Sequence, residues 1–365
     1  MCLAKLGSLN ALEQLKEQGT LKKFIGGELP SADSLGRISE LLAGNTIRGI
    51  NRELYLQLKR NKALLSPEHG LMALVVDGHE SHASYRQHCS GCLEREIGPD
   101  GNKKTQYYHR NVTALLTGAD YCFLLDAEPQ KPGEWEVDCA IRLLARVIED
   151  YPRAFDVVVA DALYTVSPFF NFVLKHNKDV ITVLKNEQRD LFQHAEQFFS
   201  TIEPSGQFTD GGTKITAWDG CGFVSWPQVN QRVRVVKTEE STRITRQLDG
   251  KTEAVKASWM WVTTLSQLKA SAKTVVQLGH NRWSIENQGF NELVNQWHSD
   301  HVYKHSPGAI LNFWLMTMLA VNTFHVFFHR NLKLCVRKAF TKQHIAKLIT
   351  GELYSRVALI RGVPP

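Results

Sequence analysis

The sequence lacks internal repeats, low-complexity segments and a recognisable secretory leader. No unit recurs at a fixed period, which excludes solenoid and propeller architectures. The first seven residues contain no long apolar run of the kind that a secretory signal needs. Hydrophobic residues make up 43% and charged residues 22% of the chain, which excludes disorder, collagen and coiled coil as descriptions of the whole. A chain of 365 residues is expected to form roughly two or three domains with a sizeable core.

The sequence also lacks the cysteine pattern of a disulfide framework. Seven cysteines are present, an odd number, and only Cys89 and Cys92 are near neighbours. This pattern favours free thiols in a reducing compartment, so we expect a cytoplasmic protein. The net charge is only +6 and the isoelectric point is about 8.9. Such a mild basic excess permits a polyanionic partner without requiring one.

Only one apolar stretch approaches the length of a membrane span. It covers residues 310–328, close to the roughly 20 residues that a transmembrane helix needs. Polar side chains interrupt it, and no second such stretch accompanies it, so we expect a buried core helix and no membrane association. The interrupting residues are Asn312, Thr317, Asn322, Thr323 and His325.

The order of the segments predicts a mixed sheet flanked by helices. Residues 1–70 show helical spacing and are expected to form an N-terminal region with a basic segment at 48–62. This segment is equally consistent with a solvated face and with phosphate contacts, and phosphate contacts would make the region DNA-binding. Residues 71–198 follow the order three strands, helix, strand, helix, strand. Short alternating runs punctuated by glycine predict an antiparallel β insertion over 199–265. Helical spacing returns in 266–330, and 331–365 form a basic tail. The predicted strands are 71–76, 106–116, 121–125, 155–160 and 180–184, and the predicted helices are 134–150, 168–176, 272–297 and 310–328.

Two of the predicted core strands end in an aspartate. Asp77 follows Val76 and Asp161 follows Ala160, and the carboxyl edge of strands is where sites form in α/β sheets. Clustered carboxylates repel one another unless a cation neutralises them, and hard oxygen ligands suit Mg²⁺ or Mn²⁺. Glu286 supplies a third acid on a helix. Arg282 lies four residues earlier on the same helix face, and this spacing alone favours an ordinary intrahelical ion pair. The order Asp, Asp, Glu on strand, strand and helix shifts the interpretation towards a site.

These residues resemble the DDE transposases of bacterial insertion sequences, which have a ribonuclease H-like fold. The resemblance rests on the order Asp, Asp, Glu, on residues 282–286 and 161–164, and on the segments 6–10 and 29–33. It implies that Asp77, Asp161 and Glu286 are catalytic and hold two Mg²⁺ or Mn²⁺ ions for phosphoryl transfer. It also implies a double-stranded DNA partner, comprising transposon ends and target, and a homodimer in the DNA complex.

The chain departs from the Tyr-x2-Arg-x3-Glu-x6-Lys signature of the branch that it resembles. Gly279 stands at the tyrosine position and Leu293 at the lysine position, so only Arg282 and Glu286 of the four remain. In the resembled branch the two missing residues would touch DNA phosphates rather than metal. The departure therefore affects DNA-end contacts more than catalysis.

Basic residues near these acids are the candidates for DNA contact. Arg232 and Arg234 alternate with valines, which puts both on one face of a strand. We expect this face to contact DNA, and the alternative is a sheet face exposed to solvent. Arg282 is expected to pair with a phosphate, and Lys185 follows a predicted core strand. We expect the N-terminal helices, the insertion and Arg282 to form one basic surface around the acids, because three carboxylates otherwise repel DNA.

A second possible metal site is a structural zinc site after the first catalytic strand. Cys89 and Cys92 form a C-x2-C pair, and one or two of the nearby histidines are expected to join them, with His109 the leading candidate beside His79, His82 and His88. The alternative is an ordinary turn, because no second C-x2-C is present. A separate site formed by His298, His301 and His305 is conceivable from their spacing, but capping and core roles are favoured.

Three functions remain open from the sequence. The first is a transposase that cleaves DNA and transfers strands. The second is a metal-dependent nuclease that uses the same acids without strand transfer. The third is a catalytically inactive DNA-binding relic of a transposase.

Overall fold

The computed structural model describes residue 13 and residues 26–27, 30–118, 121–185, 189–245 and 252–361. The segment 6–10 and Leu29, which carry part of the resemblance, lie outside this part of the chain.

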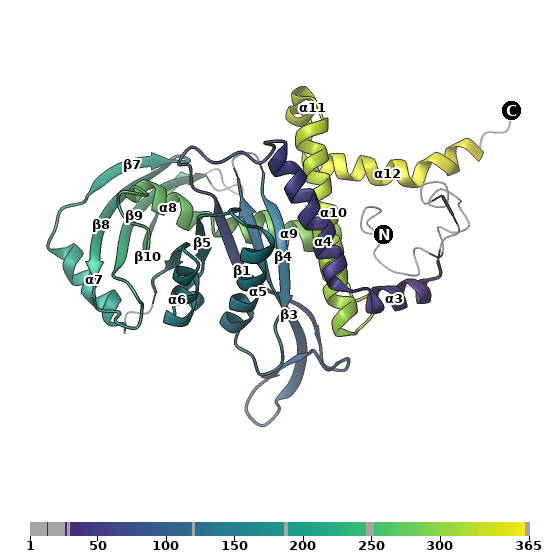
Figure 1. Ribbon diagram of the computed structural model, residues 1–365, viewed down its shortest axis with the longest axis horizontal. Helices are drawn as coiled ribbons and strands as arrows, with labels where there is room; N and C mark the ends of the chain where they lie inside the picture. The colour runs from purple at the N-terminus through teal and green to yellow at the C-terminus, as the bar shows by residue number, and fades with distance from the viewer. Residues whose placement is uncertain are drawn as a thin grey trace.

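A single mixed sheet of ten strands forms the centre of the described structure (Figure 1). The strand order is β2-β3-β1-β5-β6-β10-β9-β8-β7, with β4 paired to β3. β1 pairs antiparallel with β3 and parallel with β5, and β5 pairs parallel with β6. The strands are β1 (Ala73–Ser84), β2 (Leu93–Ile97), β3 (Lys104–Thr117), β4 (Phe123–Pro129), β5 (Val157–Ala160), β6 (Asp179–Val183), β7 (Gly206–Asp210), β8 (Thr213–Phe223), β9 (Val233–Thr245) and β10 (Thr252–Thr263).

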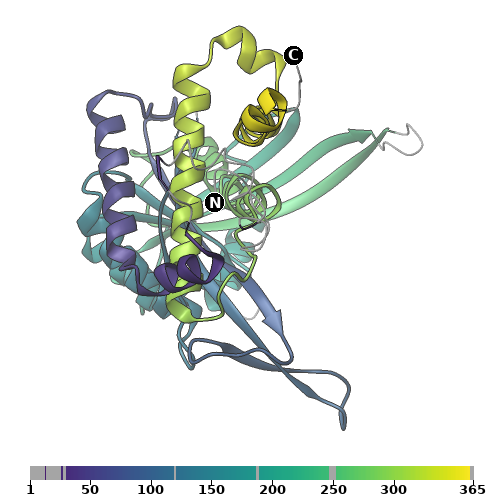
Figure 2. The same cartoon turned by 90° about the vertical axis from the view of Figure 1, so that its right-hand side faces the viewer.

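The predicted insertion continues this sheet. β10 pairs antiparallel with β6, opposing Trp261 to Val183, and β9, β8 and β7 follow outward as antiparallel neighbours. The β9–β10 hairpin and the β2–β3 hairpin both project from the body, as Figure 2 shows. The sequence did not predict β2, because this strand is short and its residues are mostly exposed.

Helices cover both faces of the sheet. The buried residues of α5 and α6 pack on one face, where Leu74 and Val76 of β1 point, and those of α8, α9 and α10 pack on the other, with Val75. This division follows from the period-two alternation of side chains along a strand. The helices are α3 (Ala32–Leu41), α4 (Gly44–Arg60), α5 (Glu136–Asp150), α6 (Ser167–Lys175), α7 (Asp190–Ser200), α8 (Ala272–His280), α9 (Asn291–Trp297), α10 (Pro307–Val326), α11 (Leu334–Ala339) and α12 (Lys342–Arg361), with short η1 (Ala162–Tyr164), η2 (Ile285–Phe290) and η3 (Phe327–Asn331).

The predicted helix over 272–297 is interrupted. It consists of α8, a turn, the π-helical η2 and α9. A π-helical stretch closes hydrogen bonds one residue later than an α-helix, so it shifts the residues before it relative to those after it. The shift falls at Glu286, which lies within η2. The interruption therefore sets the direction from which this acid approaches the sheet.

The apolar segment 310–328 is confirmed as a core helix, α10. Among the described residues one helical stretch, Pro307–Asn331, is long and apolar enough to cross a membrane, but 67% of its apolar 18-residue window is buried inside the protein. Its polar side chains have partners there. Asn312 Nδ2 donates to the Ser39 and Leu42 carbonyls at 2.9 and 2.6 Å. Asn312 therefore links α10 to the end of the N-terminal helix α3.

A buried amide pair ties α4, β4 and α10 together. Asn322 Nδ2 donates to Asn51 Oδ1 at 2.9 Å and to the Leu124 carbonyl at 2.8 Å, and Asn322 Oδ1 accepts from the Leu124 amide at 3.0 Å. Asn51 Nδ2 donates to the Leu124 and Leu125 carbonyls, each at 2.9 Å. These contacts join three elements that are far apart in the sequence.

We expect Asn322→Ala to lower the free energy of unfolding by about 2–3 kcal/mol. The substitution removes the Asn322 partners of the Leu124 amide and of Asn51 Oδ1, and each unsatisfied buried group costs about 1–3 kcal/mol. Urea unfolding at fixed pH checks this. Thr323→Ala, one residue along and exposed, serves as control and is expected to change the midpoint little.

The basic residues of α4 bind the protein itself. Arg48 Nε donates to Asp126 Oδ1 at 2.8 Å, Arg52 Nε donates to the Asp150 carbonyl at 2.8 Å, and Lys59 Nζ donates to the Pro152 carbonyl at 3.0 Å. Both readings of this basic segment, a solvated face or phosphate contacts, are therefore incomplete. α4 uses these cations to dock on β4 and on the end of α5.

Candidate functional site

Two carboxylates lie at the same level on neighbouring parallel strands. The β1–β5 ladder opposes Val75 to Val159, so Asp77 and Asp161, two residues further along, project from the same face at the carboxyl edge. Asp161 Oδ1 also accepts a hydrogen bond from the Leu163 amide at 2.8 Å and caps η1. The two aspartates are thus neighbours at the edge where α/β sheets bind ligands.

Glu286 reaches this face from η2. The Phe290 ring stacks on His79 of β1, with ring centroids 4.8 Å apart, which holds η2 against the strand that carries Asp77. Arg282 Nη1 lies 2.7 Å from Glu286 Oε1 and 3.8 Å from Asp77 Oδ2. One guanidinium therefore lies between two of the three acids, and the chain brings Asp77, Asp161 and Glu286 to one edge of the sheet.

The charge of Asp77 is poorly compensated in this site. Burial and the neighbouring Asp161 raise the pKa of Asp77 from 3.8 to about 7. The Gly78 amide donates to Asp77 Oδ1 at 2.9 Å, and Arg282 also favours the ionised form, but both together offset only part of the rise. A carboxylate in this position is neutralised either by a proton or by a bound cation.

Glu136 is a fourth acid near this edge that the sequence reasoning missed. It begins α5 on the other face, and a Cβ at Gly78 would lie 2.6 Å from Glu136 Oε1. The Tyr164 hydroxyl donates to Oε1 at 2.7 Å and Arg110 Nη1 donates to Oε2 at 2.9 Å. Glycine after Asp77 therefore makes room for Glu136. Tyr164, part of the 161–164 motif, fastens the turn after Asp161 to α5.

The two departures from the signature lie in the core. A Cβ at Gly279 would lie 2.3 Å from Trp261 Nε1, and Leu293 is fully buried. Trp261 thus occupies the space that a tyrosine at position 279 would need. Neither position is accessible to DNA, so the phosphate contacts of the resembled branch have no counterpart at these two residues.

We expect Gly279→Tyr, which would restore the signature, to destabilise the protein by about 3 kcal/mol or more. Overpacking a well-filled core costs about 1–3 kcal/mol and occasionally more, and here the added ring meets the rigid Trp261 indole. Asn287→Tyr, at an exposed position of η2, is the matched control. Equal urea midpoints for the two variants would contradict the packing that we describe.

Arg234, one of the residues expected to contact DNA, is buried within the protein. Its side chain is 3% exposed, its Nε and Nη2 donate to the two Asp219 oxygens at 2.7 and 2.8 Å, and Nη1 donates to the Ala270 carbonyl at 2.8 Å. Arg232 precedes β9 and is exposed. Both arginines lie near Asp179, at the amino end of β6, and thus at the edge opposite the acids. The alternation of arginine and valine predicted that both arginines share a face of the strand. It could not predict at which edge of the sheet they lie.

Lys185 lies at the edge that carries the acids. It follows β6, is exposed, and its Nζ lies 6.0 Å from the centroid of the Trp259 ring. Trp259 packs edge-on against Trp283 at 5.2 Å, and Arg282 lies over the Trp283 ring at 5.7 Å. An aromatic and cationic cluster thus borders Glu286.

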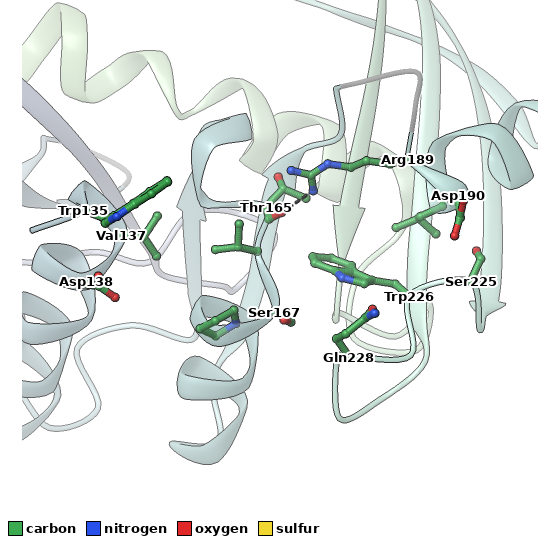
Figure 3. A pocket seen from close by; sticks show the side chains of 13 residues that line it. Trp135, Val137, Asp138, Thr165, Ser167, Arg189, Asp190, Ser225, Trp226 and Gln228 are labelled. Atoms are coloured by element: carbon green, nitrogen blue, oxygen red, sulfur yellow. Dashed lines mark hydrogen bonds between the residues drawn. The ribbon is translucent and has the colours of Figure 1, made fainter.

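A cavity of about 770 Å³ opens beside the turn that follows Asp161 (Figure 3). It lies between the start of α5, the start of α6 and the segment around Trp226. Arg189 points across it and donates from Nη1 to the Thr165 carbonyl. None of the three acids lines this cavity. The cavity and the carboxylates are therefore separate features, although the 161–165 turn and the start of α5 adjoin both.

The two cysteines of the C-x2-C pair and His109 come together as expected. Cys89 Sγ and Cys92 Sγ lie 3.4 and 3.3 Å from His109 Nε2. His305 joins them, with Nε2 at 3.4 Å from Cys92 Sγ. The spacing of His298, His301 and His305 suggested a separate site on one helix, but these residues follow α9 in a loop.

Comparison with known proteins gives a family match. The model of the family described as "Transposase DDE domain" matches residues 70–323. No curated protein matches the chain. Among solved structures, the chain is similar to "Cryo-EM structure of piggyBac transposase synaptic complex with hairpin DNA (SNHP)", with 12% identity and a TM-score of 0.42. The match covers 80% of this chain and 54% of the other, so this chain spans about half the length of that protein.

Proposed function

The chain belongs to the DDE transposase family, and from this premise we propose that it cleaves DNA and transfers strands with Asp77, Asp161 and Glu286. The observation that carries the proposal is the juxtaposition of Asp77 and Asp161 on parallel strands, with Glu286 delivered to the same edge and linked through Arg282. We further propose that the chain derives from a bacterial insertion sequence and acts in the cytoplasm on nucleoid DNA.

The strand topology supports a ribonuclease H-like catalytic domain. The strands β4, β3 and β1 form an antiparallel meander, and β5 and β6 extend it in parallel with β1. Asp77 and Asp161 lie at the end of the central parallel pair. We propose that residues 71–198 and 266–330 form this domain and that 199–265 is an insertion into it.

The donor set suits divalent cations. Carboxylate oxygens are the ligands that Mg²⁺ and Mn²⁺ prefer, and the raised pKa of Asp77 marks a site whose negative charge lacks a full counterpart. Asp77, Asp161 and Glu286 would hold the ions. Bound there, divalent cations would activate the attacking water or 3′-hydroxyl and stabilise the leaving oxygen.

The protein's own side chains would orient this site. Arg282 holds the Glu286 carboxylate against β1 and, once the acids engage cations, its guanidinium can pair with a phosphate. Tyr164 and Glu136 fix the turn that carries Asp161. The border formed by Lys185, Trp259 and Trp283 would contact the DNA strand, by charge and by stacking on an unpaired base.

The assay that tests this function uses the DNA that flanks the gene. Purified protein is incubated with a plasmid that carries both flanking ends, with Mg²⁺, with Mn²⁺ and with EDTA. We expect metal-dependent cuts at the ends and joined products in a target plasmid. Cuts without joining would indicate a nuclease, and DNA binding without cuts in either metal would indicate an inactive relic. A homodimer is expected on DNA and is measured by mass photometry of the complex.

The β9–β10 hairpin is a better candidate for DNA contact than the base of β9. From the β6 pairing onward the hairpin extends past the edge that carries the acids. Arg243 opposes Ala254 in the ladder, so it shares a face of the hairpin with Lys256, and both are exposed. We propose that these two cations contact phosphates.

We expect Arg243→Ala combined with Lys256→Ala to reduce the salt dependence of DNA binding. Each phosphate contact contributes about 0.9 to the slope of log affinity against log salt, so the slope should fall by roughly 1.8. Fluorescence anisotropy at several salt concentrations measures it. Arg232→Ala, at the opposite edge, is the matched control and should leave the slope unchanged. An equal slope in the double variant and wild type would remove the hairpin from the DNA path.

A further inference from the structure

Four side chains from three distant segments meet at one point outside the carboxylate site. Cys89 and Cys92 come from the turn between β1 and β2, His109 from β3, and His305 from the loop before α10. Their ligand atoms all lie within 4.8 Å of one another. Cys92 and His109 are buried, and Cys89 and His305 are partly buried.

The separations fit a tetrahedral metal ion. Zn–S bonds of about 2.3 Å and Zn–N bonds of about 2.0–2.1 Å imply ligand-to-ligand separations of roughly 3.3–3.8 Å. The Cys89 and Cys92 sulfurs lie 3.8 Å apart, and three sulfur–nitrogen separations are 3.4, 3.3 and 3.4 Å. The sulfur–sulfur distance is far longer than the roughly 2.05 Å of a disulfide.

The backbone around the cluster holds it in place. The Cys92 amide donates to the Cys89 carbonyl at 3.1 Å and closes the turn, and the Cys89 amide points at Cys92 Sγ at 3.2 Å. A Cβ at Gly91 would lie 2.9 Å from Pro307 Cγ. Only glycine lets the turn press against the start of α10, which brings His305 to the cysteines.

We propose that Cys89, Cys92, His109 and His305 bind one Zn²⁺ that fastens the loop before α10 to the β1–β3 strands. Two thiolates and two imidazoles form a closed Cys₂His₂ set, which is typical of a structural zinc site rather than a catalytic one. His305 is the ligand that the sequence did not identify, because it lies 213 residues from Cys92.

The proposed ion would also brace the third acid. Glu286 lies in η2, α9 follows it, and the loop from His298 leads to His305 and then to α10. Asp77 lies within β1, and Cys89 lies in the turn that follows β1. A bond between the two segments would limit how far η2 can move from Asp77, a consequence that rests on the proposed function.

Metal content tests the site directly. Full-length protein purified without added chelator is expected to contain one zinc per chain by plasma mass spectrometry. Replacement of zinc by Co²⁺ should give the visible absorption of a tetrahedral site and a sulfur-to-cobalt charge-transfer band. Zinc-free protein that shows no such spectrum with Co²⁺ would overturn the proposal, as would stoichiometric iron in place of zinc.

Variants identify the ligands. Cys89→Ser should weaken zinc binding at least tenfold and halve the charge-transfer band, and His305→Asn should weaken binding similarly while keeping that band. His88→Asn is the matched control, since His88 adjoins Cys89 but stacks on Tyr107 with centroids 4.7 Å apart. Equal zinc affinity in His305→Asn and His88→Asn would exclude His305 as a ligand.

Limited proteolysis tests the fastening without any activity assay. Lys304 precedes His305 and its side chain is 42% exposed. Trypsin also needs the backbone around Lys304 to open into an extended form, which the proposed ion would hinder. Removal of zinc from the wild type, or His305→Asn, should speed cleavage after Lys304 at least tenfold, and added zinc should restore protection in the wild type alone. Unchanged cleavage after zinc removal would contradict the fastening role, even if DNA cleavage by the acids is established.

Discussion

Asp77→Asn and Asp161→Asn are each expected to lower the rate of DNA end cleavage by about a thousandfold or more. Loss of one carboxylate removes a ligand for the cations, whose transition-state stabilisation is worth several kcal/mol, and each 1.4 kcal/mol is about tenfold in rate. Single-turnover cleavage of a labelled end measures the rate. DNA affinity should change little, because neither aspartate is expected to bind phosphate itself.

Asp100→Asn is the matched control for these substitutions. Asp100 lies in the β2–β3 connection, and its side chain is 98% exposed. The Asp100→Asn substitution removes the same charge as the two site substitutions, but far from the edge that carries the acids. Cleavage by Asp161→Asn at the rate of Asp100→Asn would remove the second aspartate from the mechanism.

Asp77→Asn is also expected to stabilise the metal-free protein, by on the order of 4 kcal/mol above pH 7. The pKa of Asp77 is raised from 3.8 to about 7 on folding, so the ionised carboxylate opposes folding, and each pKa unit is worth about 1.4 kcal/mol. The folded state binds the proton more tightly than the unfolded state. The penalty is therefore absent below about pH 4, grows between pH 4 and 7, and is constant above.

Urea unfolding in EDTA at pH 4.5 and pH 8 checks this second prediction. The stability difference between Asp77→Asn and wild type should be small at pH 4.5 and large at pH 8. Added Mg²⁺ should then stabilise the wild type and not the variant, since a ligand that binds only the folded state shifts the unfolding equilibrium. A difference that does not change with pH would show that Asp77 carries no unfavourable charge.

The sequence predicted the parts of the fold that are set by local patterns. The apolar residues before Asp77 and Val157–Ala160 before Asp161 are buried strands, because parallel strands covered on both faces need apolar side chains throughout. The predicted end of the first strand at residue 76 is wrong, since β1 continues past Asp77 to Ser84, where it pairs with β3. α10 was predicted as buried because its polar residues are too many for a membrane span. These features depend only on the residues within each segment.

The parts that it missed depend on contacts between distant segments. Nothing local to Glu136 indicates that it meets Gly78 and Tyr164. The alternation around Arg234 correctly predicts a strand, but its burial follows from Asp219 on the neighbouring β8. The sequence singled out His305 as one of three spaced histidines, yet it lies next to Cys92, which is 213 residues away in the sequence.

Diffraction from crystals soaked in Mn²⁺ tests the central claim most directly, because manganese scatters anomalously and can be located without assumptions about the chemistry. The proposed site predicts an anomalous peak held by the carboxylates of Asp77 and Asp161, with Glu286 turned toward it, and no peak there in crystals of Asp77→Asn. A well-occupied manganese site elsewhere, with an empty edge between Asp77 and Asp161, would contradict the assignment of these acids.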